Sequence, residues 1–150
     1  MTTPHGDAAD ATLLASRALL GVIARSATEA LARVTLPELR ILVLLTSNGP
    51  LAPGDITARL HGTPGITADS LESLSHQGLV EDAGQSSIRV QITSRGREIV
   101  DEVTARRRTE LAAILAKLTP DQQLELQNAL RVFAEAAEEA PAEELLILGL

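Results

Sequence analysis

The chain has 150 residues, of which 45% are hydrophobic, and it carries a formal net charge of −7. This length and apolar fraction are sufficient for one globular domain and exclude an intrinsically disordered chain. The absence of cysteine excludes disulfides and thiolate metal sites, and the single aromatic residue, Phe133, leaves no stacking platform for single-stranded nucleic acid. His5, His61 and His76 do not have the spacing of a ligand set, so we expect no metal and no cofactor.

The N-terminal segment has an apolar middle, as a signal peptide does, but it lacks the other features of one. Acidic residues stand where a signal peptide is basic, and Arg17 and Arg25 interrupt or flank the apolar run. No stretch approaches the roughly 18 apolar residues that a membrane helix needs. We therefore expect a soluble, cytoplasmic protein that does not engage a membrane.

Helical periodicity begins early in the chain. Apolar residues recur at helical spacing from residue 10 to about residue 33 and predict a long first helix. Thr35 and Glu38 form a capping-box pattern, which predicts that a second, largely buried helix follows over 36–46.

Two shorter helices are predicted next, over 53–60 and over 66–77. In the fourth helix we expect Ile66, Leu71 and Leu74 to face the core. Gly78 is expected to end this helix, because glycine readily adopts the left-handed conformation of a C-terminal cap.

The second half of the chain predicts a β-hairpin and two more helices. Residues 79–83 and 87–93 are β-branched runs, with Ile88, Val90 and Ile92 expected on one face. Thr93 is expected to cap a fifth helix over 94–117. A second capping box at Thr119 begins a sixth helix, which should end before Pro141.

This order of elements predicts a mainly α fold with a small β-hairpin, in which a winged helix-turn-helix is flanked by long helices. We expect a single domain over 1–150. Residues 35–93 would form the winged helix-turn-helix, residues 10–34 and 94–140 a helical layer, and residues 141–150 an apolar tail.

Three segments resemble the MarR family of transcriptional regulators. They are "TLPELRILVLLTSNGPL" at 35–51, "LSHQGLVE" at 74–81 and "VQITSRGREIVDEV" at 90–103. The last segment is the most specific, because Val90, Ile92, Thr93 and Gly96 have the spacing that the family shows where the second strand of the wing is followed by the next helix. The order and spacing of the three segments extend the resemblance over nearly the whole chain.

The resemblance implies a homodimer, with the first, fifth and sixth helices as the dimerisation layer. It also implies that a small lipophilic ligand binds between this layer and the DNA-reading part, and Leu13, Arg17, Leu39 and Leu42 are the candidate neighbours of such a ligand. The tail "LLILGL" at 145–150 favours a dimer independently, because an exposed apolar tail would promote aggregation unless a partner or the chain itself covered it.

The sequence departs from the family on the surface that reads DNA. Positions of the fourth helix that are often basic in the family hold Asp69, Ser73 and Gln77, and the usual Asp-x-Arg of the wing is replaced by Gly84 and Ser86. Residues 60–88 contain no Lys or Arg, whereas they contain four acids. These acids, which form the expected acidic surface, are Asp69, Glu72, Glu81 and Asp82.

Three hypotheses follow for function. In the first, the protein binds DNA weakly, and the candidate contacts are Thr67, Ser70, Ser73, Arg89 and Arg95. In the second, duplex binding is lost, and the acidic surface binds another protein, such as a basic DNA-binding domain. In the third, the protein carries a small ligand.

Catalysis is not expected, because the chain lacks the Lys-Ser/Thr of a phosphate loop, a nucleophile elbow and a zinc-protease motif. Arg106, Arg107 and Arg108 span about 200° of a helix and cannot all face one ligand. We expect them to form a solvated face that pairs along the helix with Asp101, Glu102 and Glu110.

Overall fold

The computed structural model describes residues 4–84 and 88–137. The predicted apolar tail at 141–150 and Ser86 lie outside the described residues. Six helices and a two-stranded hairpin occur in the described part, which confirms the predicted mainly α fold. The elements, in chain order, are α1 Pro4–Leu31, α2 Leu36–Asn48, α3 Pro53–Arg59, α4 Pro64–His76, β1 Val80–Asp82, β2 Val90–Ile92, α5 Ser94–Leu115 and α6 Pro120–Ala136.

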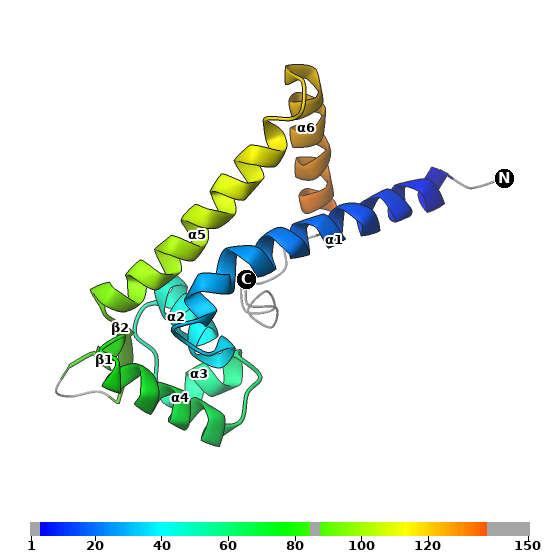
Figure 1. Cartoon of the computed structure of the whole chain (residues 1–150). Coiled ribbons are helices and arrows are strands. Elements are labelled where there is room, and N and C mark those ends of the chain that lie inside the picture. The colour runs from blue at the N-terminus through cyan, green and yellow to red at the C-terminus, as the bar shows by residue number, and fades with distance from the viewer. Residues whose placement is uncertain (1–3, 85–87, 138–150) are drawn as a thin grey trace.

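The molecule consists of a small head and three outer helices. Helices α2, α3 and α4 and the hairpin form the head, and α1 and α5 leave it as two long diverging arms (Figure 1). Helix α6 turns back from the far end of α5 toward α1 (Figure 1). Within the head, α3, the turn after it and α4 form a helix-turn-helix, and the hairpin is its wing.

Helix α2 is the centre of the core, and its sequence explains why. Its capping box is present, since the Thr35 hydroxyl accepts from the Glu38 amide at 3.4 Å and the Glu38 carboxylate accepts from the Thr35 amide at 2.6 Å. Residues from every other head element and from the near halves of α1 and α5 pack around this helix. The fully buried members of α2 are Leu39, Ile41, Leu42, Leu44 and Leu45.

The wing is a short antiparallel pair with a third bridging residue. Val80 pairs with Ile92, and Asp82 pairs with Val90. On the other side of β2, the Leu51 amide donates to the Val90 carbonyl at 3.1 Å, and the Val90 amide donates back to the Leu51 carbonyl at 2.8 Å. The hairpin is therefore fastened to the segment between α2 and α3.

The junction between α4, the wing and α5 is tightly closed. Gly78 ends α4 with a positive φ of 68°, as predicted from its position. The Thr93 hydroxyl donates to the Gly78 carbonyl at 2.8 Å and accepts from the Gly96 amide at 3.2 Å, so one side chain joins the end of α4 to the start of α5. These residues carried the family resemblance, and their contacts explain the spacing.

Several sequence predictions about side-chain placement are wrong. Ile66 was expected in the core but is 55% exposed, whereas Thr67 and Ser70 are buried. The inward positions of α4 are 67, 70, 71 and 74, so Ile66 lies off the buried stripe. Ile88 was expected on the inner face of a strand, but β2 begins only at Val90 and Ile88 is 87% exposed.

The arginines of α5 also pair differently from the prediction. Two of the three bond across to α1 rather than along their own helix: Arg106 pairs with Glu29, and Arg107 Nε donates to the buried Ser26 hydroxyl at 3.3 Å. Burial between the two helices lowers the pKa of Arg107. The acids of α5 likewise pair outside their own helix, Glu110 with Arg25 of α1 at 2.9 Å and Glu102 with Arg33 in the turn after α1.

Candidate nucleic-acid interface

The outward surface of α4 is the part of a helix-turn-helix that meets DNA in this class of fold. In this protein the surface is formed by Asp69, Glu72, Ser73, His76 and Gln77, which line a shallow hollow of about 360 Å³. Gln77 Nε2 donates to Ser73 Oγ at 3.2 Å. The three positions that the family often fills with basic residues therefore share one outward surface, and none of them carries a positive charge here.

Two of the five candidate DNA contacts do not reach this surface. Thr67 is 5% exposed and Ser70 is 8% exposed, because both lie on the inner stripe of α4. Their side chains therefore face the head and not a base edge. Ser73, Arg89 and Arg95 remain accessible, with Ser73 half-buried and the two arginines exposed.

The wing adds negative charge beside α4. Glu81 and Asp82 are exposed on β1, and Gln91 Nε2 on β2 donates to Glu81 Oε1 at 2.9 Å. Because a glutamine is neutral, this hydrogen bond positions the Glu81 carboxylate without cancelling its charge. Arg89 precedes β2, and its carbonyl accepts from the Ala83 amide at 2.9 Å, which closes the described part of the hairpin.

A groove lies between α4 and the wing. Its floor is apolar, with buried Leu71 and Val80 and the half-buried Val90, and its volume is about 350 Å³. Glu72 stands on the α4 side, and Asp82 stands on the β1 side. We call this cavity the α4–β1 groove; its lining residues are Pro53, Ala68, Leu71, Glu72, Ser75, Val80, Glu81, Asp82 and Val90.

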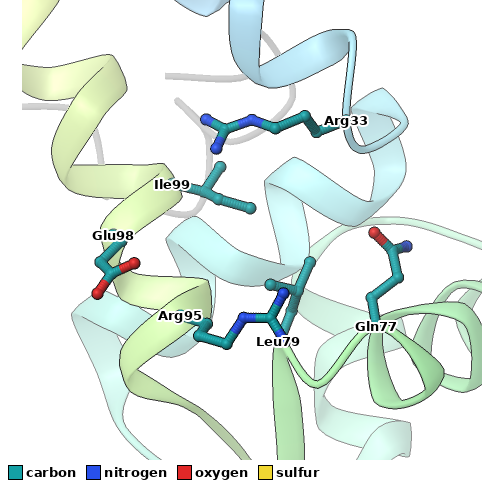
Figure 2. A pocket seen from close by; sticks show the side chains of 6 residues that line it. All are labelled: Arg33, Gln77, Leu79, Arg95, Glu98 and Ile99. Atoms are coloured by element: carbon teal, nitrogen blue, oxygen red, sulfur yellow. The ribbon is translucent and has the colours of Figure 1, made fainter.

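Positive charge gathers instead at the C-terminal end of α4. A cavity of about 480 Å³ is lined by Arg33 and Arg95, together with Gln77, Leu79, Glu98 and Ile99 (Figure 2). In Figure 2 the Arg95 guanidinium extends toward Leu79, and the Glu98 carboxylate points away from it. Arg33 forms an ion pair with Glu102, so Arg95 is the available cation of this cavity at the C-terminal end of α4.

The candidate ligand neighbours do not come together. Leu39 and Leu42 are buried in the centre of the head, whereas Leu13 is 60% exposed on the outer half of α1, where Arg17 is also exposed. None of the cavities described above is lined by these four residues. The sequence did not predict the α4–β1 groove or the position of Arg33 beside the same cavity as Arg95, because each depends on how separate elements pack together.

Two further features of the described residues bear on function. Residues 4–84 and 88–137 contain no group of three or more His, Asp or Glu side chains placed to hold a metal ion. No helix in the same ranges combines the length and apolarity needed to cross a membrane.

The elements and their arrangement define a winged helix-turn-helix protein. A crystal structure of Rv1404 from Mycobacterium tuberculosis is 30% identical, with a TM-score of 0.75, and the match covers 91% of this chain and 96% of that chain. The Mycobacterium tuberculosis MarR family protein Rv2887, solved in complex with DNA, is 27% identical with a TM-score of 0.56 over 81% of this chain and 95% of that one.

A curated relative, an uncharacterised HTH-type transcriptional regulator, YfiV, from Bacillus subtilis, is 24% identical over 114 residues, which are 73% of this chain and 71% of the relative. No family model matches the chain. Rv2887 is described as a MarR family protein, and YfiV is described as an HTH-type transcriptional regulator. The chain has the winged-helix fold of the MarR family of transcriptional regulators. None of these three relatives is described as an enzyme.

Proposed function

We propose that this protein is a homodimeric MarR-family regulator whose head binds duplex DNA weakly or not at all. The observation that carries the proposal is the charge of the reading surface. Asp69 and Glu72 are exposed on α4, Glu81 and Asp82 are exposed on the wing, and the described residues of α4 contain no Lys or Arg. A surface that docks on phosphates normally supplies cations at these places.

The interaction energies expected at this surface favour weak binding of duplex DNA. Like charges brought together across an interface cost several kcal/mol. The helix dipole at the start of α4 offers only about 0.3–1 kcal/mol toward a phosphate, which does not offset that cost. Arg89 and Arg95 lie at the edges of the surface, and they are too few to replace the missing cations. We therefore expect a Kd in the non-specific range, about 10⁻⁴ to 10⁻⁶ M at physiological salt.

The proposed dimer rests on apolar residues that the single chain leaves open. Helix α6 has no buried residue among those described, and Leu124, Leu130, Val132 and Phe133 on it are about half exposed or more. The outer half of α1 also exposes leucines, and the end of α5 exposes Ile114 and Leu115. Exposed apolar surface on this scale is typical of a protein–protein interface, and a second copy would cover it.

The test is a titration of the purified protein against labelled duplex from its own locus at physiological salt, with a scrambled duplex as the control. We expect binding that is weaker than micromolar and alike for the two duplexes. Nanomolar binding that prefers the native sequence would overturn the proposal and make the protein an ordinary repressor. The result is interpretable only at a stated salt concentration, because phosphate contacts are salt-dependent.

The second candidate function is regulation through a protein partner. The observation that favours it is the α4–β1 groove, because an apolar floor between carboxylates suits a basic protein segment better than it suits a nucleic acid.

A further inference from the structure

We infer that the α4–β1 groove binds an extended, basic and amphipathic peptide segment in which Lys or Arg alternates with small aliphatic residues. The inference deepens the second candidate function, and it rests on the proposed loss of duplex binding at the same surface.

The floor of the groove determines which apolar side chains of the partner peptide can fit. Leu71 is 9% exposed and Val80 is 4% exposed, and Val90 and Pro53 are half-buried, so the floor is well packed from beneath and open only above. A volume of about 350 Å³ is at the lower end of the range for small-molecule pockets, so it suits a few aliphatic side chains rather than a larger organic ligand.

The rim sets the charged part of the partner. Exposed carboxylates flank the floor on both sides, with Glu72 on α4 and Asp82 on β1, and neither has an ion pair among the described residues. Glu81 adds a third carboxylate, which is held by neutral Gln91. Lys and Arg side chains match this arrangement, because their long stems let the charged ends reach the carboxylates of the rim while neighbouring aliphatic side chains occupy the floor.

Duplex DNA does not share this complementarity. It offers phosphates to the rim, and the apolar floor lies below carboxylates that repel them. The groove is also the part of the reading surface that lies between α4 and the wing, so a bound peptide and a docked duplex would exclude one another.

The probe is a fluorescein-labelled octapeptide of alternating Lys and Val, followed by fluorescence anisotropy with the full-length protein. Two control peptides separate the contribution of the positive charge from that of the aliphatic side chains. An alternating Lys–Gly octapeptide has the same charge without aliphatic side chains, and an alternating Glu–Val octapeptide reverses the charge. We expect the Lys–Val peptide to bind at least about tenfold more tightly than the Lys–Gly peptide, and the Glu–Val peptide not to bind.

Three variants locate the binding. The double variant Glu72→Gln, Asp82→Asn should weaken Lys–Val binding by about tenfold, since it removes two partly exposed charge contacts. Its control, Asp101→Asn with Asp121→Asn, removes the same charge from exposed positions on α5 and α6 and should change binding by less than about twofold. Ala68→Trp fills the groove without changing charge at an exposed position, so it should abolish binding while the melting temperature stays unchanged.

Equal binding of the Lys–Val and Lys–Gly peptides, or equal loss in the two double variants, would overturn the inference, because net charge alone would then explain the binding. Nanomolar, sequence-specific duplex binding, measured without peptide because a polyanionic duplex would itself bind a lysine-rich peptide, would overturn the proposed function and the inference that rests on it. Weak duplex binding combined with no peptide binding would overturn the inference alone.

Discussion

Gly96 is the residue whose size is most tightly constrained at the junction of the wing and α5. A Cβ atom added there would overlap the Leu79 carbonyl oxygen and would lie 2.8 Å from Ile92 Cγ1. The first of these atoms belongs to the backbone of the α4–β1 junction, which is fixed by the hydrogen bonds of Thr93, so it cannot move aside cheaply.

We predict that Gly96→Ala lowers the free energy of unfolding by about 1–3 kcal/mol, measured by urea denaturation. Alanine normally stabilises a helix relative to glycine by about 0.5–1 kcal/mol. A loss of stability in Gly96→Ala would therefore show that the steric clash outweighs this gain. Gly65→Ala is the matched control, because Gly65 is also in the first turn of a helix but has nothing within 4 Å of an added Cβ. A stability of Gly96→Ala equal to that of the control would contradict the close packing.

Single polar residues were the least predictable part of the candidate interface. Thr67 and Ser70 have side chains that suit DNA contact, yet they are buried, while Ile66 beside them is exposed. When a helix contains few apolar residues, its sequence does not fix which of two neighbouring positions faces the core. A shift of one position turns a side chain by about 100° around the helix axis. The acidic residues were easier to place, because charged groups are seldom buried without a partner.

At the level of elements, local chemistry accounts for what the sequence predicted well. The capping boxes at Thr35 and Thr119 are both present, and α2 and α6 begin where these boxes require. The cross-helix pairs between α1 and α5 were not predictable, because they join residues far apart in the chain, such as Arg106 with Glu29. The groove has the same origin, since its walls come from α4 and the hairpin.

Helix α4 offers a direct test of the charge argument. We predict that the triple variant Asp69→Arg, Ser73→Arg, Gln77→Arg gains salt-dependent duplex binding, because these three side chains line one outward hollow and would meet the phosphates together. We expect affinity to rise by at least about tenfold over the unmodified protein at low salt, and to fall steeply as salt is added. Electrophoretic mobility shift over a salt series measures both.

The control for this helix places the same added charge elsewhere. Asp101→Arg, Thr104→Arg, Ala112→Arg changes the net charge by the same amount at exposed positions of α5. If this control binds duplex as well as the α4 variant does, the location of the charge is irrelevant and the assignment of α4 as the reading surface fails.

Across the described residues, most exposed apolar residues lie away from the core, and Leu36, Ile66 and Ile88 are the exceptions in the head. The core is confined to the head and the near halves of α1 and α5, whereas the outer half of α1, the end of α5 and all of α6 expose apolar side chains. Figure 1 shows α6 lying apart from the head and joined to it through α5. Such a helix gains little stability from its own chain, because packing of an apolar face supplies most of the stability of a helix.

We therefore predict that Phe133→Glu dissociates the proposed dimer. Phe133 is 56% exposed in the single chain, and it would be covered by a second copy. Losing its burial on both subunits costs roughly 2–4 kcal/mol, which raises the dimer dissociation constant by about 30-fold or more in sedimentation velocity. Gln127→Glu is the matched control, since it adds the same charge at an exposed polar position of the same helix. Equal sedimentation of the two variants would show that α6 does not form the interface, and a Phe133→Glu protein that stays dimeric at nanomolar concentration would place the contact on α1 or α5 instead.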